Sequence, residues 1–216
     1  MRGAPRGCKG FFGRLRALAN FSGLVAAGCS LPLVLATRAA FVPTEAEPAP
    51  PHGDHPPPGF TGGFGEETCH SCHFDNDLNE ADGRLAIEGL PPAYRPDTVY
   101  FVTVRLEREQ LPRAGFMLSA RFASGKQAGM LHATDEYTAV SVVDSTGVAY
   151  AHHTLPGTAV TEGSLARWTL RWVAPRDAAP VDTVYFDAVA NASNDDESAF
   201  GDRIYTQAVR LKPSPK

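Results

Sequence analysis

The ten residues 98–107, "TVYFVTVRLE", decide the fold that this sequence predicts. β-branched and aromatic residues dominate the stretch, and these residue types favour strands. Successive side chains of a strand point to opposite faces. One face then carries Tyr100, Val102, Val104 and Leu106, and the other carries Val99, Phe101, Thr103 and Arg105. We expect a strand with the first of these faces against the core.

The same period of two recurs along the chain. In "LARWTLRWVA", residues 165–174, two tryptophans and a leucine alternate with two arginines and a threonine. Short runs of this kind, separated by Gly, Pro, Asp and Asn, are typical of strands and turns. We place strands near residues 84–88, 98–107, 115–122, 138–143, 147–153, 165–174, 182–190 and 203–211. The sequence therefore predicts an all-β domain over 83–216, an immunoglobulin-like antiparallel β-sandwich.

Residues 1–40 predict a membrane anchor or signal peptide. An uncharged run of 21 residues lies between Arg16 and Arg38, and about 20 apolar residues span a bilayer as a helix. The basic residues before this run keep the N-terminus in the cytoplasm. We favour an uncleaved anchor that holds the domain on the periplasmic side of the inner membrane. The alternatives are a cleaved signal peptide and a lipoprotein cut before Cys29.

Residues 41–60 predict a spacer. They contain seven prolines, which excludes a helix and a paired strand and favours an extended, polyproline-like chain. We expect His52 and His55, which lie in this spacer, to be solvated.

Charge is distributed unevenly. Residues 1–40 hold six basic residues and no acidic ones, so 41–216 hold all 24 acidic residues and 14 basic ones, a formal charge of −10. Such a surface repels phosphate backbones, which argues against nucleic-acid binding. It favours a partner protein with a basic docking face.

Residues 61–82 contain the motif C-x-x-C-H, formed by Cys69, Cys72 and His73. Covalent haem attachment needs two thiols at this spacing and an imidazole directly after the second one. Because Cys8 and Cys29 precede the exported part, no disulfide scaffold is available. The motif therefore predicts one haem c, attached through Cys69 and Cys72 with His73 as an axial iron ligand. A zinc site and a redox dithiol are the alternatives.

The exported part resembles the bacterial Reeler-like domains, also called choice-of-anchor domains. The resemblance covers roughly residues 59–211. It is carried by "GFTGGFGEETCHSCH", "IEGLPPAYRPDTVYFVTVRL", "RAGFMLSARF", "AYAHHT", "RWTLRWVAP", "VYFDAVANASNDDES" and "GDRIYT". It implies an exported Reeler-like sandwich, of the immunoglobulin kind, with a haem attached to the loop before its first strand.

A six-coordinate haem needs a second axial ligand, a histidine or a methionine. The resemblance implies a histidine followed by threonine, which falls on His153 and Thr154, so His153 is our first choice. Met117 is the main rival, and His132, His152 and Met130 are further candidates. We expect Met130 and His132 to lie in a loop, and His152 and His153 to point to opposite faces of one strand. His70, between the cysteines, is tethered too closely to reach the other side of the ring.

No catalytic motif accompanies these residues. The acidic runs "DNDLNEADG" and "NDDESAFGD" lack the glycine and the bidentate glutamate of a calcium loop, so we interpret them as solvated turns. The sequence therefore predicts a membrane-tethered periplasmic monohaem cytochrome that transfers electrons and is no enzyme. Such a protein can serve as an accessory subunit of a respiratory or photosynthetic complex. The alternative is a non-redox β-sandwich interaction module whose C-x-x-C-H motif holds a metal.

Overall fold

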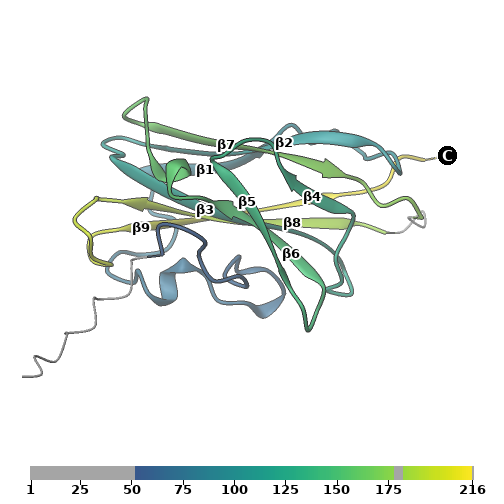
Figure 1. Ribbon diagram of the computed structural model, residues 1–216, viewed down its shortest axis with the longest axis horizontal. Helices are drawn as coiled ribbons and strands as arrows, with labels where there is room; N and C mark the ends of the chain where they lie inside the picture. The colour runs from purple at the N-terminus through teal and green to yellow at the C-terminus, as the bar shows by residue number, and fades with distance from the viewer. Residues whose placement is uncertain (1–51, 178–181, 216) are drawn as a thin grey trace, which may run out of the picture. The chain divides into compact units, whose positions relative to one another are not determined.

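A computed structural model describes residues 52–177 and 182–215, which form two antiparallel sheets (Figure 1). The four-stranded sheet has the order β1-β2-β7-β4, and the five-stranded sheet has the order β5-β6-β3-β8-β9. Their bounds are β1 Gly83–Glu88, β2 Val99–Arg108, β3 Arg113–Phe122, β4 Met130–Ala133, β5 Thr138–Val143, β6 Val148–His153, β7 Leu165–Val173, β8 Val184–Ser193 and β9 Arg203–Leu211. The predicted all-β fold with two antiparallel sheets is confirmed.

The core lies between the two sheets and follows the predicted alternation. In β2, Val102, Val104 and Leu106 are fully buried, while Phe101 on the other face is 60% exposed. In β7, Trp168 stacks on Phe116 of β3 with ring centroids 4.7 Å apart, which joins the two sheets. Burying such large side chains is the main source of stability in a sandwich.

Strand β4 was not predicted. Its four residues pair with β7, where Leu131 opposes Trp172, but four residues are too short for a clear period of two. The predicted loop placement of Met130 and His132 is therefore wrong, since both lie in β4. Strand β8 also extends to Ser193, beyond the predicted end at residue 190.

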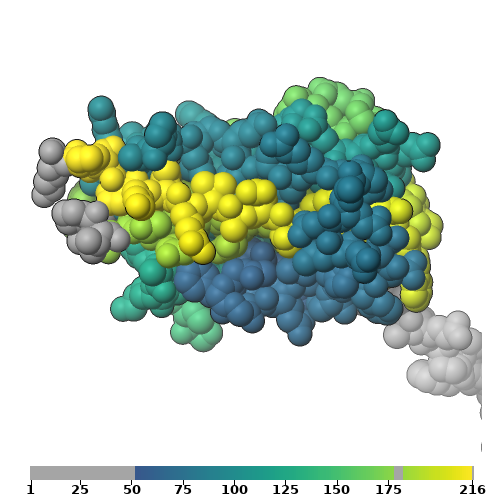
Figure 2. Space-filling view, turned by 180° about the vertical axis from the view of Figure 1, so that it is seen from behind, coloured from purple at the N-terminus to yellow at the C-terminus, as the bar shows by residue number. Residues whose placement is uncertain are grey.

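The outer face of the five-stranded sheet is covered by the chain that precedes β1. Met117, Ser119 and Arg121 of β3 point away from the main core, yet each is at most 4% exposed. Two short 3-10 turns, η1 Gly63–Gly65 and η2 Cys69–Ser71, belong to the covering segment. Figure 1 shows this segment beside β3, β6 and β8, and Figure 2 shows its dark blue surface along the yellow C-terminal strand. The C-x-x-C-H motif thus lies on the sheet.

No helix within residues 52–177 and 182–215 is long and apolar enough to cross a membrane. The predicted anchor at 1–40 and most of the predicted spacer at 41–60 lie outside the described residues.

Candidate functional site

The C-x-x-C-H motif forms one helical turn. Thr68 caps it by accepting a hydrogen bond from the backbone N–H of His70 (3.2 Å). The backbone N–H groups of Cys72 and His73 both donate to the carbonyl oxygen of Cys69, at 3.2 and 3.0 Å. Residues three and four apart share one side of such a turn. Cys69, Cys72 and His73 are therefore presented together, and neither thiol is in a disulfide.

The two thiols have different surroundings. Cys69 packs against a small apolar cluster on the outer face of the five-stranded sheet, formed by Met117, Val148, Tyr150, Val189 and Ile204. Burial raises the pKa of the Cys69 thiol to about 12, so this thiol stays protonated at neutral pH. Cys72 is exposed. Reactive dithiols carry a cysteine whose pKa is lowered, so the raised value disfavours a thioredoxin-like role.

His73 is held by a buried carboxylate. Its Nδ1 lies 2.7 Å from Oδ2 of Asp202, whose side chain is 1% exposed. A carboxylate only accepts hydrogen bonds, so Nδ1 of His73 is the donor in this bond. Within the described part of the chain, Nε2 of His73 has no hydrogen-bond partner. That nitrogen is the one able to bind a metal.

Asp202 is itself fixed by donors. Asn191 donates from its side-chain amide to Oδ2 (2.9 Å), and the backbone N–H of Asn194 donates to Oδ1 (3.0 Å). Burial by itself raises the pKa of Asp202, but the hydrogen bonds from His73, Asn191 and Asn194 outweigh it, so the pKa lies below its ordinary value. The carboxylate is therefore ionised at neutral pH.

Exposed aromatic rings flank His73. Phe74 follows it in sequence and is 60% exposed, and its ring contacts that of Phe200, which is 59% exposed, with centroids 6.2 Å apart. Leu78 is also exposed nearby in sequence. An apolar surface beside an exposed thiol and a free imidazole nitrogen suits an apolar planar ligand.

The ring of His153 lies against Gly115 of β3, and Gly115 is paired with a residue that contacts His73. Its Nδ1 is 3.0 Å from the backbone nitrogen of Phe116, and its ring lies so close to Gly115 that an added Cβ would be 2.6 Å from Cε1. Gly115 pairs with Asn191 across β3 and β8, and Asn191 also contacts His73, at 3.3 Å from its Nδ1. Directly paired Cα atoms of antiparallel strands lie about 5 Å apart. His153 and His73 therefore lie beside adjacent positions of one sheet.

Both histidines of β6 contact the end of the predicted spacer. The ring of His152 meets that of His55, with centroids 5.5 Å apart, and Nε2 of His153 lies 3.3 Å from the carbonyl oxygen of His52. Burial lowers the pKa of both His152 and His153, so both are neutral at pH 7. The expectation that only one of the pair could face this side is wrong. His52 and His55 are exposed, as expected, and each also contacts β6.

The other candidate ligands differ in position. Met117 is 1% exposed in the cluster against which Cys69 packs, and it pairs with His152 across β3 and β6. His70 bonds through Nε2 to the carbonyl oxygen of Asn76 (2.8 Å). His132 lies in β4 of the four-stranded sheet, and packed sheets are about 10 Å apart. Of the candidates outside the motif, Met117, His152 and His153 are on the sheet that carries it.

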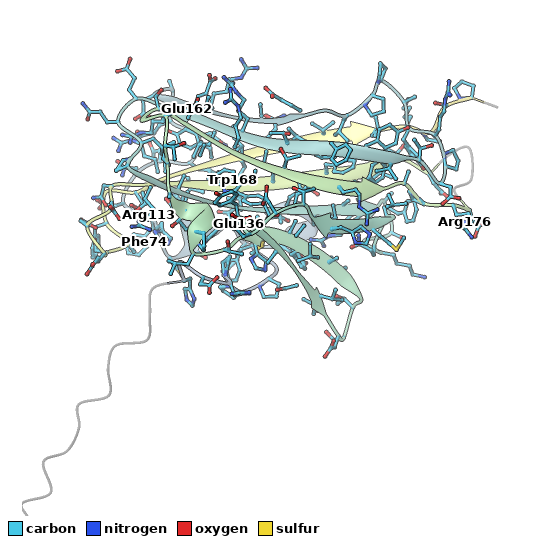
Figure 3. The ribbon with its side chains drawn as sticks, turned by 45° about the horizontal axis from the view of Figure 1, so that its top comes forward. Phe74, Arg113, Glu136, Glu162, Trp168 and Arg176 are labelled. Atoms are coloured by element: carbon cyan, nitrogen blue, oxygen red, sulfur yellow. The ribbon has the colours of Figure 1, made fainter. Side chains whose placement is uncertain are left out.

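Met130 lines a hollow of about 330 Å³ together with Val173 and Arg176. Figure 3 labels Arg176 and Phe74 at opposite ends of the sandwich. The hollow is thus remote from His73, which precedes Phe74.

A buried ion pair beneath the motif was not predicted. Glu66 accepts from the guanidinium of Arg121 and from the hydroxyl of Tyr150, and Arg121 lies 4.9 Å from the centre of the Phe64 ring. Burial by itself raises the pKa of Glu66, but bonds from Tyr150, Thr61 and Arg121 outweigh it and lower the pKa. The sequence signal was Arg121, a charged residue close to the end of a mainly apolar strand.

Each of the two acidic runs contains an aspartate that bonds to another part of the chain. Asp82 is exposed and lies in a turn, as interpreted, and it also accepts from the Tyr205 hydroxyl (2.6 Å) and pairs with Arg108 and Arg203. Asp202, at the end of the second run, is buried against His73. Within residues 52–177 and 182–215, no three His, Cys, Asp or Glu side chains form a metal-binding group.

No protein-family model and no curated protein matches the chain. Among solved structures, it is similar to the Reelin-N domain of F-spondin, with 21% identity, a TM-score of 0.45, and coverage of 68% of this chain and 97% of that one. It is also similar to the human F-spondin reeler domain, with 22% identity, a TM-score of 0.41, and coverage of 65% of this chain and 96% of that one. A cohesin module from a Clostridium perfringens family 33 glycoside hydrolase is similar as well, with 8% identity, a TM-score of 0.43, and coverage of 63% of this chain and 100% of that one. Reeler domains are thus among the solved structures that this chain resembles.

Proposed function

We propose that this protein is a monohaem c-type cytochrome that transfers electrons. The observation that carries the proposal is the helical turn 69–73, which presents two free thiols and an imidazole whose Nε2 is unbonded. Covalent haem attachment uses that set of groups at that spacing. The raised pKa of Cys69 argues against the dithiol alternative.

The surroundings of the turn fit a haem. Cys69 and Cys72 would hold the ring covalently, and Nε2 of His73 would bind the iron. The exposed rings of Phe74 and Phe200 offer apolar contact beside it. A haem c supplies one-electron exchange when bound. The chain's own residues orient the imidazole, exclude water from the Cys69 side and set the electrostatic environment.

His153 is the ligand that we propose for the second axial position. The support is its position beside Gly115, whose paired residue Asn191 contacts His73. To bind the iron, Nε2 of His153 would have to leave its contact with the carbonyl oxygen of His52. Burial keeps the imidazole neutral, as an iron ligand must be. Two axial histidines leave no open position for a substrate, which favours electron transfer over catalysis.

The cellular setting is proposed from the sequence. An N-terminal anchor and a spacer would hold the domain on the periplasmic side of the inner membrane, within reach of a basic redox partner. The domain would then work alone or as an accessory subunit of a respiratory or photosynthetic complex.

The test is haem attachment itself. The full chain is produced together with a c-type haem attachment system and run on a denaturing gel stained for haem. We expect haem to remain on the wild-type chain and on the H70A control, and to be lost when Cys69 and Cys72 are both changed to Ser. A wild-type chain without haem, or one that binds zinc instead, would refute the proposal and favour the interaction module.

Spectra of the purified protein then test the second ligand. We expect a low-spin oxidised spectrum for the wild type and for the H132A control, and a high-spin spectrum for H153A. A sulfur-to-iron charge-transfer band near the red end of the wild-type spectrum would show methionine ligation and point to Met117 instead.

A further inference from the structure

The hydrogen bond between His73 and Asp202 joins the motif to a residue 129 positions later in the chain. The two side chains differ in exposure, because His73 is 29% exposed and Asp202 is 1% exposed. The buried partner therefore defines the geometry, and the imidazole adapts to it. Asp202 immediately precedes β9, so the strand fixes its backbone.

The carboxylate has little freedom to move. Asn191 and the backbone N–H of Asn194 each donate to one of its oxygens, at 2.9 and 3.0 Å. Asn76 donates to the backbone carbonyl of Asp202 (2.8 Å), which ties the same residue to the loop after the motif. An acceptor residue that is held by three donors, two from the end of β8 and one from the loop after the motif, keeps the His73 ring in one orientation.

We infer that Asp202 is a positioning residue that holds the His73 imidazole for the iron and lowers the reduction potential of the haem. This inference rests on the proposed function. An ionised carboxylate accepts a stronger hydrogen bond from Nδ1–H than a neutral carbonyl does. It therefore increases the electron density at Nε2, and this makes the imidazole a stronger donor to the iron.

The effect has a definite direction. The oxidised iron carries one more positive charge than the reduced iron, so a stronger donor and a nearby negative charge both stabilise the oxidised state. A stabilised oxidised state means a lower potential. With haem bound, the site would pass one electron to an oxidised one-electron carrier protein; no bond would be made or broken, and Asp202 would hold the proton on Nδ1 of His73.

The inference also specifies the class of partner. A haem held by two imidazoles, with a buried carboxylate behind one of them, would have a lower potential than one with a methionine ligand or without the carboxylate. It accepts electrons only from a donor of still lower potential, and it passes them readily to carriers of higher potential.

The experiment compares the potentials of haem-loaded full-length variants by spectroelectrochemical titration. Asp202→Asn keeps the shape of the side chain but removes the charge, and we expect its potential to shift upward. Glu197→Gln is the matched control, because Glu197 is exposed in the same loop and has no hydrogen bond or ion pair within the described part of the chain. We expect no shift from it.

A second variant is expected to shift the potential in the opposite direction. Asn191→Ala removes one of the two donors to Oδ2, so the carboxylate is left to bond more strongly to His73, and the potential should fall. General loosening of the site does not predict opposite shifts from two neighbours. If Asp202→Asn does not fold, a fall in Asn191→Ala supports the inference and an unchanged potential overturns it.

The possible failures are distinguishable. A wild-type chain without haem overturns the proposed function and, with it, this inference. A haem-loaded Asp202→Asn chain with the wild-type potential overturns the inference alone, and Asp202 is then a structural residue.

Discussion

The outer face of the five-stranded sheet contains a partly buried carboxylate, that of Asp187. Asp187 of β8 is half-buried, its Oδ2 has no hydrogen-bond partner in the described structure, and Gly63 presses against it so closely that an added Cβ would lie 2.3 Å from that oxygen. Burial raises the pKa of Asp187, and the nearby Glu66 adds to the rise. The folded state therefore disfavours the ionised form.

The raised pKa of Asp187 makes the stability of the protein depend on pH. An acid whose pKa is raised in the folded state destabilises the protein wherever it is ionised, and the penalty vanishes below the unfolded value of 3.8. We therefore expect Asp187→Asn to be more stable than the wild type at pH 7, with the gain disappearing below pH 3.8. Urea unfolding at several pH values measures it.

Asp144→Asn controls for this experiment. Asp144 is an exposed carboxylate in the turn between β5 and β6, and it has no hydrogen bond or ion pair within residues 52–177 and 182–215. Its substitution should leave the unfolding free energy unchanged at every pH. Equal or lower stability of Asp187→Asn at pH 7 would contradict the burial argument.

What the sequence could predict at this scale was local. Cys69, Cys72 and His73 are neighbours in the chain, so their spacing could be recognised. Asp202 is buried against His73 from 129 residues away. No spacing rule connects the two, because strand pairing and loop packing bring them together. Charge in a glycine- and aspartate-rich run is typical of a solvated turn, and here packing overrides that preference.

At the level of elements, the loop 61–82 is held on the sheet by the pair of Glu66 and Arg121. The Arg121 side chain is 5% exposed and that of Glu66 is 17% exposed. Removing one partner of a buried pair leaves the other charge uncompensated, which costs on the order of 3 kcal/mol. The guanidinium also contacts the rings of Phe64 and Tyr150. This pair therefore anchors the segment that carries the motif.

We expect Arg121→Met to lower the unfolding free energy by about 3 kcal/mol and to speed proteolytic cleavage within residues 61–68. Arg210→Met is the control, since Arg210 is exposed on the same sheet and lies 5.3 Å from the Tyr185 ring. Its substitution should cost less than about 1 kcal/mol. Denaturant unfolding and limited proteolysis measure both effects, and equal effects of the two substitutions would show that the ion pair is not the anchor.

Strand prediction succeeded where the period of two ran for six or more residues. Burial alternates along β2 and β7, as the sequence predicts. Strand β3 is buried on both faces. The exception, β4, is short and forms at an edge, so its pairing with β7 is decided by tertiary contact rather than by its own sequence. That the outward face of β3 is covered by the chain before β1 was not predicted.

In the molecule as a whole, the two faces of the five-stranded sheet have different roles. The inner face of the five-stranded sheet builds the core with Phe116, Leu118 and Phe186, and its outer face supports the motif loop. The candidate site is thus held by a rigid scaffold while its thiol Cys72 and the ring of Phe74 remain exposed. If the site holds a haem as proposed, electrons would be exchanged through the exposed edge of the ring, and the charge surrounding that edge would determine which partners approach.

The negative charge of the domain should make its electron exchange depend on salt. Residues 41–216 have a formal charge of −10, and opposite charges accelerate encounter by about tenfold or more at low salt. We expect electron exchange between the haem-loaded protein and a basic carrier protein to slow by at least about tenfold as ionic strength rises from about 0.01 M to about 0.15 M, where the screening length falls from ~30 Å to ~8 Å. Oxidation of the reduced, haem-loaded protein by ferricyanide, an anion, should speed up over the same range. Stopped-flow kinetics measures both rates. If neither rate responds to salt, the acidic surface does not surround the exchanging edge, and partner choice must come from apolar contacts such as Phe74 and Phe200.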